Sequence, residues 1–270
     1  MKYINFREKK VAYTSKGKGT TVVLIHGFCE DGAMWDEFKQ DLLEENFRVV
    51  CIDLPGAGKS EAMIGLSIEG MAEVVHAVIE ELSLDKFVLI GHSMGGYVAL
   101  NYAAKHEALL LGLGLFHSHP YADTPEKKEA RQKSIDFIGR QGHVLFVKQL
   151  IPGLFPPVFV RSNAFLIEKL TYRATRYPGA GIVNALQAMK DRPDQSEVLK
   201  NIQVPVLFII GAKDTAIPAE ASIEQTHLPA VAQVHILEKV GHMGQFEAKK
   251  ATQSMVRQFV GFCLEHAKKE

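Results

Sequence analysis

The stretch VLIGHSMGGYVAL, residues 88–100, places a single serine between glycines at the end of an apolar run. Its central pattern GHSMG, residues 91–95, fits G-x-S-x-G, in which small residues permit the sharp strand-to-helix turn that exposes a serine hydroxyl. The same pattern also suits a glycine-rich turn that serves only close packing. A serine hydroxyl is a weak nucleophile near neutral pH, so a chemical role for Ser93 requires a base and a group that orients the base.

Two residues further along the chain could supply these groups. Asp214 follows the apolar run VPVLFIIG (204–211), and His242 follows the run QVHILEKV (233–240) within a glycine-flanked loop. If these runs are parallel strands, their carboxyl ends open on the same sheet edge as Ser93. Taken singly, Asp214 could be a turn residue and His242 a loop histidine bonded to the backbone. Together, in the order serine, aspartate, histidine, they predict a catalytic triad.

Acyl transfer also requires donors for the oxyanion of its tetrahedral intermediate. The HGF turn at residues 26–28 follows an apolar run and could aim the backbone N–H of Phe28 at the nucleophile. The backbone N–H of Met94, which begins the helix after Ser93, is the second predicted donor. The alternative for the HGF turn is a sharp turn without a chemical role.

The elements that must position these residues are apolar, β-branched runs alternating with amphipathic stretches. The apolar runs lie at residues 21–28, 47–56, 86–93, 109–118, 204–211 and 233–240. Their hydrophobicity is continuous, which is typical of parallel strands buried on both faces. Residues 67–83 and the C-terminal stretch have helical spacing and predict covering helices, while residues 3–17 predict an antiparallel hairpin. The predicted fold class is therefore α/β.

The alternation breaks between Pro120 and about Ser196, where proline-punctuated helical stretches follow one another without a convincing strand. We predict a core domain formed by residues 1–119 and 197–270, with residues 120–196 inserted as a helical cap (lid). Most apolar cap residues should pack helices together, and some should roof a substrate pocket.

Three residues near the predicted sheet edge are candidates for that pocket. His117 and His119 would point to the same side of a strand end, although surface or hinge positions suit them equally. Cys29 follows the predicted oxyanion turn, but no histidine is placed to activate its thiol. Asp123 is an alternative orienting acid, ranked below Asp214 because its neighbours favour a helix cap.

The spacing of the histidines and glycines does not indicate a metal or cofactor site. The histidines near the sheet edge lack the close ligand pairs of compact zinc sites. The stretch DLPGAGKS, residues 53–60, lacks the first glycine of a phosphate-binding P-loop. We therefore expect neither a metal nor an organic cofactor.

Composition restricts the partners and the compartment. The 31 Lys and Arg residues balance the 31 Asp and Glu residues, which argues against attraction to nucleic acid or an anionic membrane. No stretch approaches the roughly 20 apolar residues of a membrane span, and no apolar signal region is seen near the start. The three widely spaced cysteines argue against a disulfide framework. We expect a cytoplasmic protein, and the sequence leaves its oligomeric state undetermined.

In this order, the motifs resemble those of the α/β-hydrolase superfamily across essentially the whole chain. The resemblance rests on the HGF turn with Trp35 after it, residues 53–60, the GHSMG turn, Asp214, and Gly241 with His242. It implies an α/β-hydrolase fold: an eight-stranded, mostly parallel sheet flanked by helices, with a cap after the sixth strand. It also implies structural roles for Trp35 and Asp53. Relatives with epoxide hydrolase or haloalkane dehalogenase activity carry an aspartate where this chain has Ser93.

The resulting hypothesis is a serine hydrolase, carboxylesterase-like, that cleaves a small to medium carboxylic ester through an acyl-enzyme. Perhydrolysis, C–C bond hydrolysis and lyase chemistry are alternatives, because they need no different core residues on this scaffold. A ligand-sensing receptor of the same fold is a further alternative. The expected partner is a small-molecule, ester-type substrate.

Overall fold

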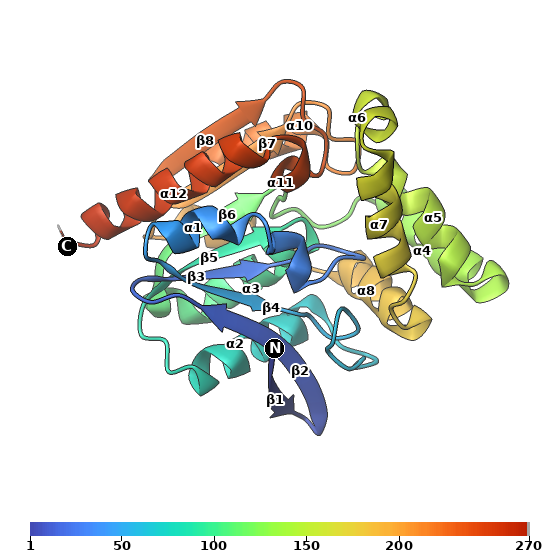
Figure 1. Cartoon of the computed structure of the whole chain (residues 1–270), viewed down its shortest axis with the longest axis horizontal. Helices are drawn as coiled ribbons and strands as arrows, with labels where there is room; N and C mark the ends of the chain where they lie inside the picture. The colour runs from blue at the N-terminus through green and yellow to red at the C-terminus, as the bar shows by residue number, and fades with distance from the viewer. Residues whose placement is uncertain (269–270) are drawn as a thin grey trace.

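An eight-stranded sheet runs through the centre of the molecule (Figure 1). The structure is a computed structural model of the chain, and residues 1–268 are described. The strands are β1 Lys2–Phe6, β2 Lys9–Lys16, β3 Thr21–Ile25, β4 Arg48–Ile52, β5 Phe87–His92, β6 Leu110–Phe116, β7 Val206–Gly211 and β8 Ala232–Leu237. They lie in the order β1-β2-β4-β3-β5-β6-β7-β8, and only the pairs that include β2 are antiparallel. The predicted mostly parallel sheet is confirmed.

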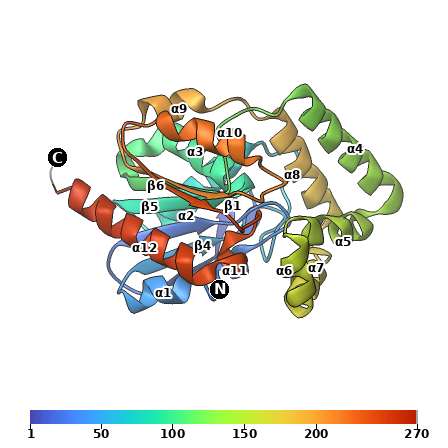
Figure 2. The ribbon, with the colours of Figure 1, turned by 90° about the horizontal axis from the view of Figure 1, so that it is seen from above.

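Helices cover both faces of the sheet (Figure 2), with α1 and α12 on one face and α2 and α3 on the other. The α-helices are α1 Lys39–Glu44, α2 Ile68–Glu81, α3 Met94–His106, α4 Pro125–Gln141, α5 His143–Gly153, α6 Pro157–Ser162, α7 Ala164–Ala174, α8 Gly179–Asp191, α9 Ser196–Asn201, α10 Ala219–Glu224, α11 Gly244–Glu247 and α12 Lys249–His266. Within residues 1–268, no helix is long and apolar enough to cross a membrane.

The central strands are buried on both sides, which explains their continuous hydrophobicity. In β3, Val23 and Ile25 join one hydrophobic cluster, whereas Val22 and Leu24 join the cluster on the opposite face. All four side chains are fully buried. Full burial of such a side chain stabilises the fold by about 1.5–3 kcal/mol. The carboxyl ends of these strands are therefore fixed in position along one edge.

The two edges of the sheet differ from its centre. Arg7 and Glu8, with φ of 48° and 62°, form the two-residue turn between β1 and β2, so the predicted hairpin is confirmed. The run at 233–240 was expected to be a strand buried on both faces, and this expectation is wrong. Its strand β8 pairs only with β7 and is an edge, where Val234 and Ile236 are 40% and 43% exposed.

A helical insert, α4 to α8, follows β6 and lies beyond the strand ends (Figure 1). The N-terminus of α4 has the residues expected of a helix N-cap. Thr124 is the N-cap residue and its hydroxyl accepts from the Lys127 amide, and Pro125 is the first helical residue. The backbone N–H of Gln195 donates to the carbonyl oxygen of Pro120 at 2.8 Å, so the two ends of the insert meet. We propose residues 120–196 as the cap on this basis.

Asp31 ties the insert to the core. One oxygen of its carboxylate accepts hydrogen bonds from Arg173 Nε at 2.5 Å and from the Tyr177 hydroxyl at 2.7 Å. Arg173 lies in the last turn of α7, and Tyr177 follows that helix. Its other oxygen accepts from the Ala33 amide at 2.9 Å. The loop after β3 and the insert are thus held together by a buried carboxylate, which is 3% exposed.

Candidate active site

Ser93 occupies the sharp turn between β5 and α3. Its backbone angles are φ 50° and ψ −117°, a conformation that non-glycine residues rarely adopt. Its N–H donates to the carbonyl oxygen of Phe116 at 2.9 Å, and its own carbonyl oxygen accepts from the Ser118 hydroxyl at 2.8 Å. The turn requires Gly91, because a Cβ there would lie 2.1 Å from the carbonyl oxygen of Gly95. The strained turn thus holds Ser93 at the start of a helix, beyond the strand end.

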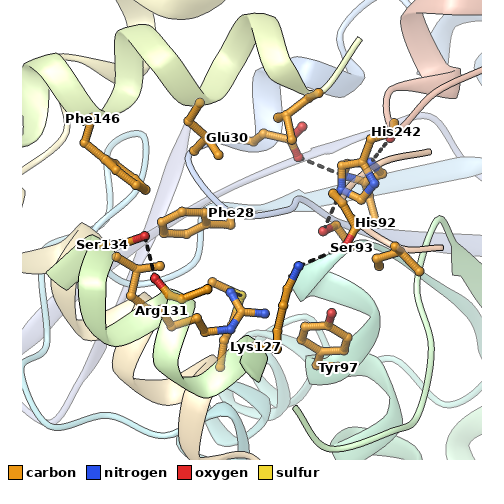
Figure 3. A pocket seen from close by; sticks show the side chains of 17 residues that line it. Phe28, Glu30, His92, Ser93, Tyr97, Lys127, Arg131, Ser134, Phe146 and His242 are labelled. Carbon is orange, nitrogen blue, oxygen red and sulfur yellow. Dashed lines mark hydrogen bonds and ion pairs between the residues drawn. The ribbon is translucent and has the colours of Figure 1, made fainter. Parts of the chain in front are cut away.

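Asp214 and His242 meet Ser93 beside this turn. Asp214 follows β7 and His242 follows β8, and Figure 3 shows the His242 ring directed at Ser93. Nδ1 of His242 lies 2.7 Å from Oδ2 of Asp214, and Nε2 lies 2.9 Å from Oγ of Ser93. A carboxylate can only accept, so Nδ1 carries the ring proton and Nε2 is free to accept the proton of Ser93.

The surroundings of Asp214 keep its carboxyl group ionised. Burial by itself raises the pKa of Asp214, but the charge and hydrogen bond of His242 outweigh it and lower the pKa to about 2. Oδ1 also accepts from the amides of Ala216 and Ile217 at 2.8 and 2.9 Å. An ionised, fixed carboxylate orients the His242 ring and stabilises the imidazolium form.

The two predicted oxyanion donors lie on either side of the turn. Phe28 follows β3, and Met94 begins α3, whose first N–H groups have no partner within the helix. Neither backbone N–H donates a hydrogen bond to a residue within 1–268; Phe28 lines the cavity that contains Ser93, and Met94 directly follows Ser93 in the chain. Between them, a Cβ on Gly27 would lie 2.7 Å from Nδ1 of His92 and 3.1 Å from Cβ of Ser93. The absence of a side chain at Gly27 therefore lets this loop approach the serine, and both amides are available there.

Ser93 and His242 open into a cavity of about 210 Å³ below the helical insert (Figure 3). This volume lies below the roughly 300–1,000 Å³ of sites for drug-sized ligands, so the cavity suits a small molecule. Its walls are mainly apolar, formed by Phe28, Tyr97, Ala130, Phe146, Leu150, Leu154, Leu186, Met189, Ala216 and Ile217. Phe28 from the core and Phe146 from α5 pack with ring centroids 6.2 Å apart, so cap residues do roof the space beside Ser93.

The three residues predicted for the substrate pocket do not line this cavity. His117 does not point into the cavity because strand β6 ends at Phe116. His117 itself has φ of 49°, so the side-chain alternation of a strand, which the prediction assumed, does not extend to it. His117 is buried behind Asp214, with its Nδ1 3.6 Å from Oδ2, and its Nε2 accepts from the Gly244 amide at 3.3 Å. Burial holds its pKa well below the ordinary value. His117 is thus a neutral support for the acid.

His119 and Cys29 are likewise directed elsewhere. His119 lies against Tyr97, with ring centroids 5.6 Å apart, and is shielded from the cavity by it. Burial, followed by the charge of Arg192, lowers the pKa of His119 to about 3. Cys29 has φ of 57°, which turns its side chain into a neighbouring cavity beside Tyr177. Burial raises the pKa of its thiol well above the ordinary value, so it remains protonated.

Glu30 and His92 form a buried pair next to His242, which we did not predict from the sequence. Nδ1 of His92 lies 2.9 Å from the Glu30 carboxylate, and Nε2 of His92 donates to the carbonyl oxygen of His242 at 2.9 Å. Glu30 also accepts from the Gly27 amide at 2.7 Å. Burial lowers the pKa of His92, but the charge and hydrogen bond of Glu30 outweigh burial, and the pKa of His92 is raised. Burial raises the pKa of Glu30, but the charge and hydrogen bond of His92 outweigh it, and the pKa of Glu30 is lowered. The available signal was an acid in the HGFCED loop and a histidine directly before Ser93.

Two further residues on the cavity wall, Lys127 and Arg131, are also absent from our predictions. They are four residues apart on α4 and therefore share a helix face, which was the available signal. Asp123, the alternative orienting acid, is hydrogen-bonded to Arg131 and Arg192 and not to His242. Asp214 is thus the acid that contacts the ring of His242.

Known proteins with similar sequences and folds place the chain in a family. Residues 20–135 match the alpha/beta hydrolase fold family. An esterase from Thermogutta terrifontis, solved with malate bound, is 30% identical, with 94% of each chain covered and a TM-score of 0.89. An esterase from Exiguobacterium antarcticum shares the fold at 24% identity, with a TM-score of 0.87 over 96% of this chain and 98% of that chain.

A curated relative points to related chemistry. The 2-hydroxy-6-oxononadienedioate/2-hydroxy-6-oxononatrienedioate hydrolase of Cupriavidus pinatubonensis is 28% identical over 272 residues, which cover 94% of this chain and 91% of that protein. With the eight-stranded sheet and helical insert, these matches show that the chain belongs to the α/β-hydrolase superfamily. It is a hydrolase of that fold.

Proposed function

We propose that this hydrolase cleaves a small carboxylic ester through an acyl-enzyme formed on Ser93. The observation that carries the proposal is the hydrogen-bonded series Asp214, His242, Ser93, with distances of 2.7 and 2.9 Å, at the wall of a small cavity. The 30% identical Thermogutta terrifontis protein, an esterase, supports the same activity.

Ser93 acts as the nucleophile in this mechanism. Its Oγ attacks the ester carbonyl carbon while Nε2 of His242 takes the hydroxyl proton, and Asp214 stabilises the resulting imidazolium. The tetrahedral intermediate then collapses, its bond to the alcohol oxygen breaks, and His242 returns the proton to that oxygen. Water attacks the acyl-enzyme by the same route, which releases the acid and restores the serine hydroxyl.

The amides of Phe28 and Met94 bind the oxyanion that develops in each half-reaction. Two backbone donors without a partner in residues 1–268, one at Phe28 in the wall of the Ser93 cavity and one on the residue after Ser93, support this assignment. Loss of a single such donor typically lowers kcat by about 10²- to 10³-fold. The buried pair of Glu30 and His92 holds the backbone of His242 from the other side.

Hydrolysis of a C–C bond is the second candidate, favoured by the name of the Cupriavidus pinatubonensis relative. The same Ser93 and His242 would serve, but the leaving group would be a carbanion that requires protonation at carbon. Ester hydrolysis and C–C bond hydrolysis would therefore use the same nucleophile, Ser93, and act on different substrates.

Hydrolysis of 4-nitrophenyl acetate, butyrate, hexanoate and octanoate tests the first candidate, and cleavage of a diketone tests the second. Ser93→Ala and His242→Ala should each lower kcat by about 10⁴-fold or more, since such residues act as a unit. Ser162→Ala is a matched control, because Ser162 is an exposed serine at the end of α6.

A fluorophosphonate probe provides an independent measurement. It should label the wild-type protein with one-to-one stoichiometry, and Ser93→Ala should abolish the labelling. Wild-type protein that turns over neither substrate class, or ester hydrolysis that persists in Ser93→Ala, would refute the proposal.

A further inference from the structure

The helix α4 presents two cations to the cavity that contains Ser93. Lys127 and Arg131 both line it, and Figure 3 shows their side chains extending from α4 toward the cavity interior. The opposite walls are mainly apolar, and among the described residues that line the cavity the one acid is Glu30. Glu30 is already paired with His92 and the Gly27 amide, so it does not neutralise the cations of α4.

Arg131 has a donor that lacks a strong acceptor. Its Nε and Nη2 donate to the carboxylate of Asp123. Its Nη1 faces the thioether sulfur of Met189 at 3.4 Å, and both of these residues line the cavity. A thioether is a weak acceptor. The Nη1 group of Arg131 therefore has only a weak acceptor at the cavity wall.

Lys127 is less fully partnered than Arg131. Its ammonium group donates to the carbonyl oxygen of Ala216 at 3.2 Å, and it forms no ion pair with a carboxylate within residues 1–268. Lys127 is exposed to solvent, so the two remaining N–H donors of its ammonium group face water and are available to a bound anion. Partial burial, followed by the charge of Arg131, lowers the pKa of Lys127 against the opposing charges of Asp123 and Asp214.

The charges of this cluster do not balance. Within residues 1–268, Asp123 is the one carboxylate that forms ion pairs with Arg131 and Arg192, and Lys127 adds a third cation beside them. Arg192 stacks on Tyr97, 3.9 Å from its ring centroid, and so lies directly behind a residue of the cavity wall. An anion placed between Lys127 and Arg131 would supply the missing acceptor and compensate the excess positive charge.

We propose that Lys127 and Arg131 bind a carboxylate group of the substrate, so that the preferred ester is the half-ester of a small dicarboxylic acid. This inference rests on the proposed ester hydrolysis at Ser93 and specifies its substrate class. A carboxylate is favoured over a phosphate because Arg131 has already given two of its five N–H donors, those on Nε and Nη2, to Asp123.

The test compares matched esters that differ in one charge. We would measure kcat/KM for the mono-4-nitrophenyl esters of glutaric and adipic acid, and for the 4-nitrophenyl esters of pentanoic and hexanoic acid. Lys127→Met should lower the ratio of anionic to neutral kcat/KM by about 10- to 100-fold, the usual effect of one charge-assisted hydrogen bond. Lys127→Arg should retain most of the preference. Lys128→Met, an exposed neighbour on the same helix, should leave the ratio unchanged.

This design separates a binding role from a merely structural one. If Lys127 served only to hold the Ala216 loop, Lys127→Met would slow both esters equally, and the unchanged ratio would overturn the inference. A wild-type preference for the neutral esters would do the same.

A binding measurement keeps the inference distinct from the proposed function. Glutarate and inorganic phosphate are titrated by calorimetry into the wild-type protein, Lys127→Met and Lys128→Met. We expect glutarate to bind wild type and Lys128→Met, with at least tenfold weaker binding to Lys127→Met. This result would uphold the carboxylate site even if no ester were hydrolysed. Phosphate binding that depends on Lys127, without glutarate binding, would refute the carboxylate assignment.

Discussion

Nδ1 of His92 lies 2.9 Å from the Glu30 carboxylate, while Nε2 of the same ring lies 2.9 Å from the carbonyl oxygen of His242. A carbonyl oxygen can only accept, so Nε2 carries a proton. One further proton lies between Nδ1 and the carboxyl group, and the pair is neutral overall whichever atom holds it. The backbone of His242 is thus anchored by a buried pair that adds no net charge to the site.

Glu30→Gln should weaken this anchor. A glutamine cannot compensate a protonated His92, and it cannot both donate to Nδ1 and accept from the Gly27 amide with one atom. We expect the free energy of unfolding to fall by about 1–3 kcal/mol, together with a lower kcat for the ester. Thermal unfolding and steady-state kinetics measure the two effects. Glu37→Gln, at an exposed surface ion pair, is the control and should cost less than about 1 kcal/mol; equal losses in both variants would contradict the anchoring role.

The stability of the protein should depend on Asp214 in acid. Its folded-state pKa of about 2 lies below the roughly 3.9 of an unfolded aspartate, so the unfolded chain binds the proton more readily. The contribution of this ionised carboxylate is therefore present above about pH 4, and it is lost as the pH falls toward 2. Urea unfolding of wild type and Asp214→Asn at several pH values should show wild type losing about 2 kcal/mol more over this interval. Parallel losses would show that Asp214 is not the responsible group.

Gly91 should tolerate no side chain. Gly91→Ala places a Cβ 2.1 Å from the carbonyl oxygen of Gly95, within the turn that holds Ser93, so we expect loss of soluble protein or of activity. Gly139→Ala is the matched control, because Gly139 lies within α4 and a Cβ there meets no atom within 4 Å. That variant should be more stable by up to about 1 kcal/mol, since alanine favours helix. Soluble yield, melting temperature and kcat decide between these outcomes; an active Gly91→Ala protein would show that the turn can relax.

The hydroxyl of Tyr177 should help to hold the cap on the core. Tyr177→Phe removes a hydrogen bond of 2.7 Å to the buried carboxylate of Asp31, at an expected cost of about 1–2 kcal/mol in unfolding free energy. Hydrogen exchange of the amides in α7 should also become faster. Tyr172→Phe changes an exposed tyrosine of the same helix and should alter stability by less than about 0.5 kcal/mol. Indistinguishable exchange in the two variants would argue against a tether at Asp31.

Local patterns were sufficient to predict the sheet and the approach of Ser93, Asp214 and His242. Buried parallel strands have a continuous apolar pattern, and parallel strands bring residues at their carboxyl ends to one edge. The edge strand β8 was mispredicted as buried on both faces. Gln233 and His235 alternate with apolar residues in it, and its position at the edge depends on the whole topology.

Contacts that depend on loop conformation could not be predicted in this way. His117 was assigned to the pocket because strand alternation was assumed, and its positive φ cannot be inferred from the residue type. Glu30 and His92 are 62 residues apart, and their pairing depends on how the loop after β3 folds over the serine turn. The four-residue spacing of Lys127 and Arg131 indicated that they share a helix face. Which way that face points depends on how the cap packs, which the sequence does not reveal.

The order of these elements along the chain has a consequence for how the protein becomes active during its synthesis. His242 lies 149 positions after Ser93 and follows the strand at the very edge of the sheet. A ribosome therefore completes the serine turn and the whole cap well before it reaches the histidine. Under the proposed mechanism, the growing polypeptide carries a hydroxyl without its base, and hydrolysis begins only once the last strand has added to the sheet.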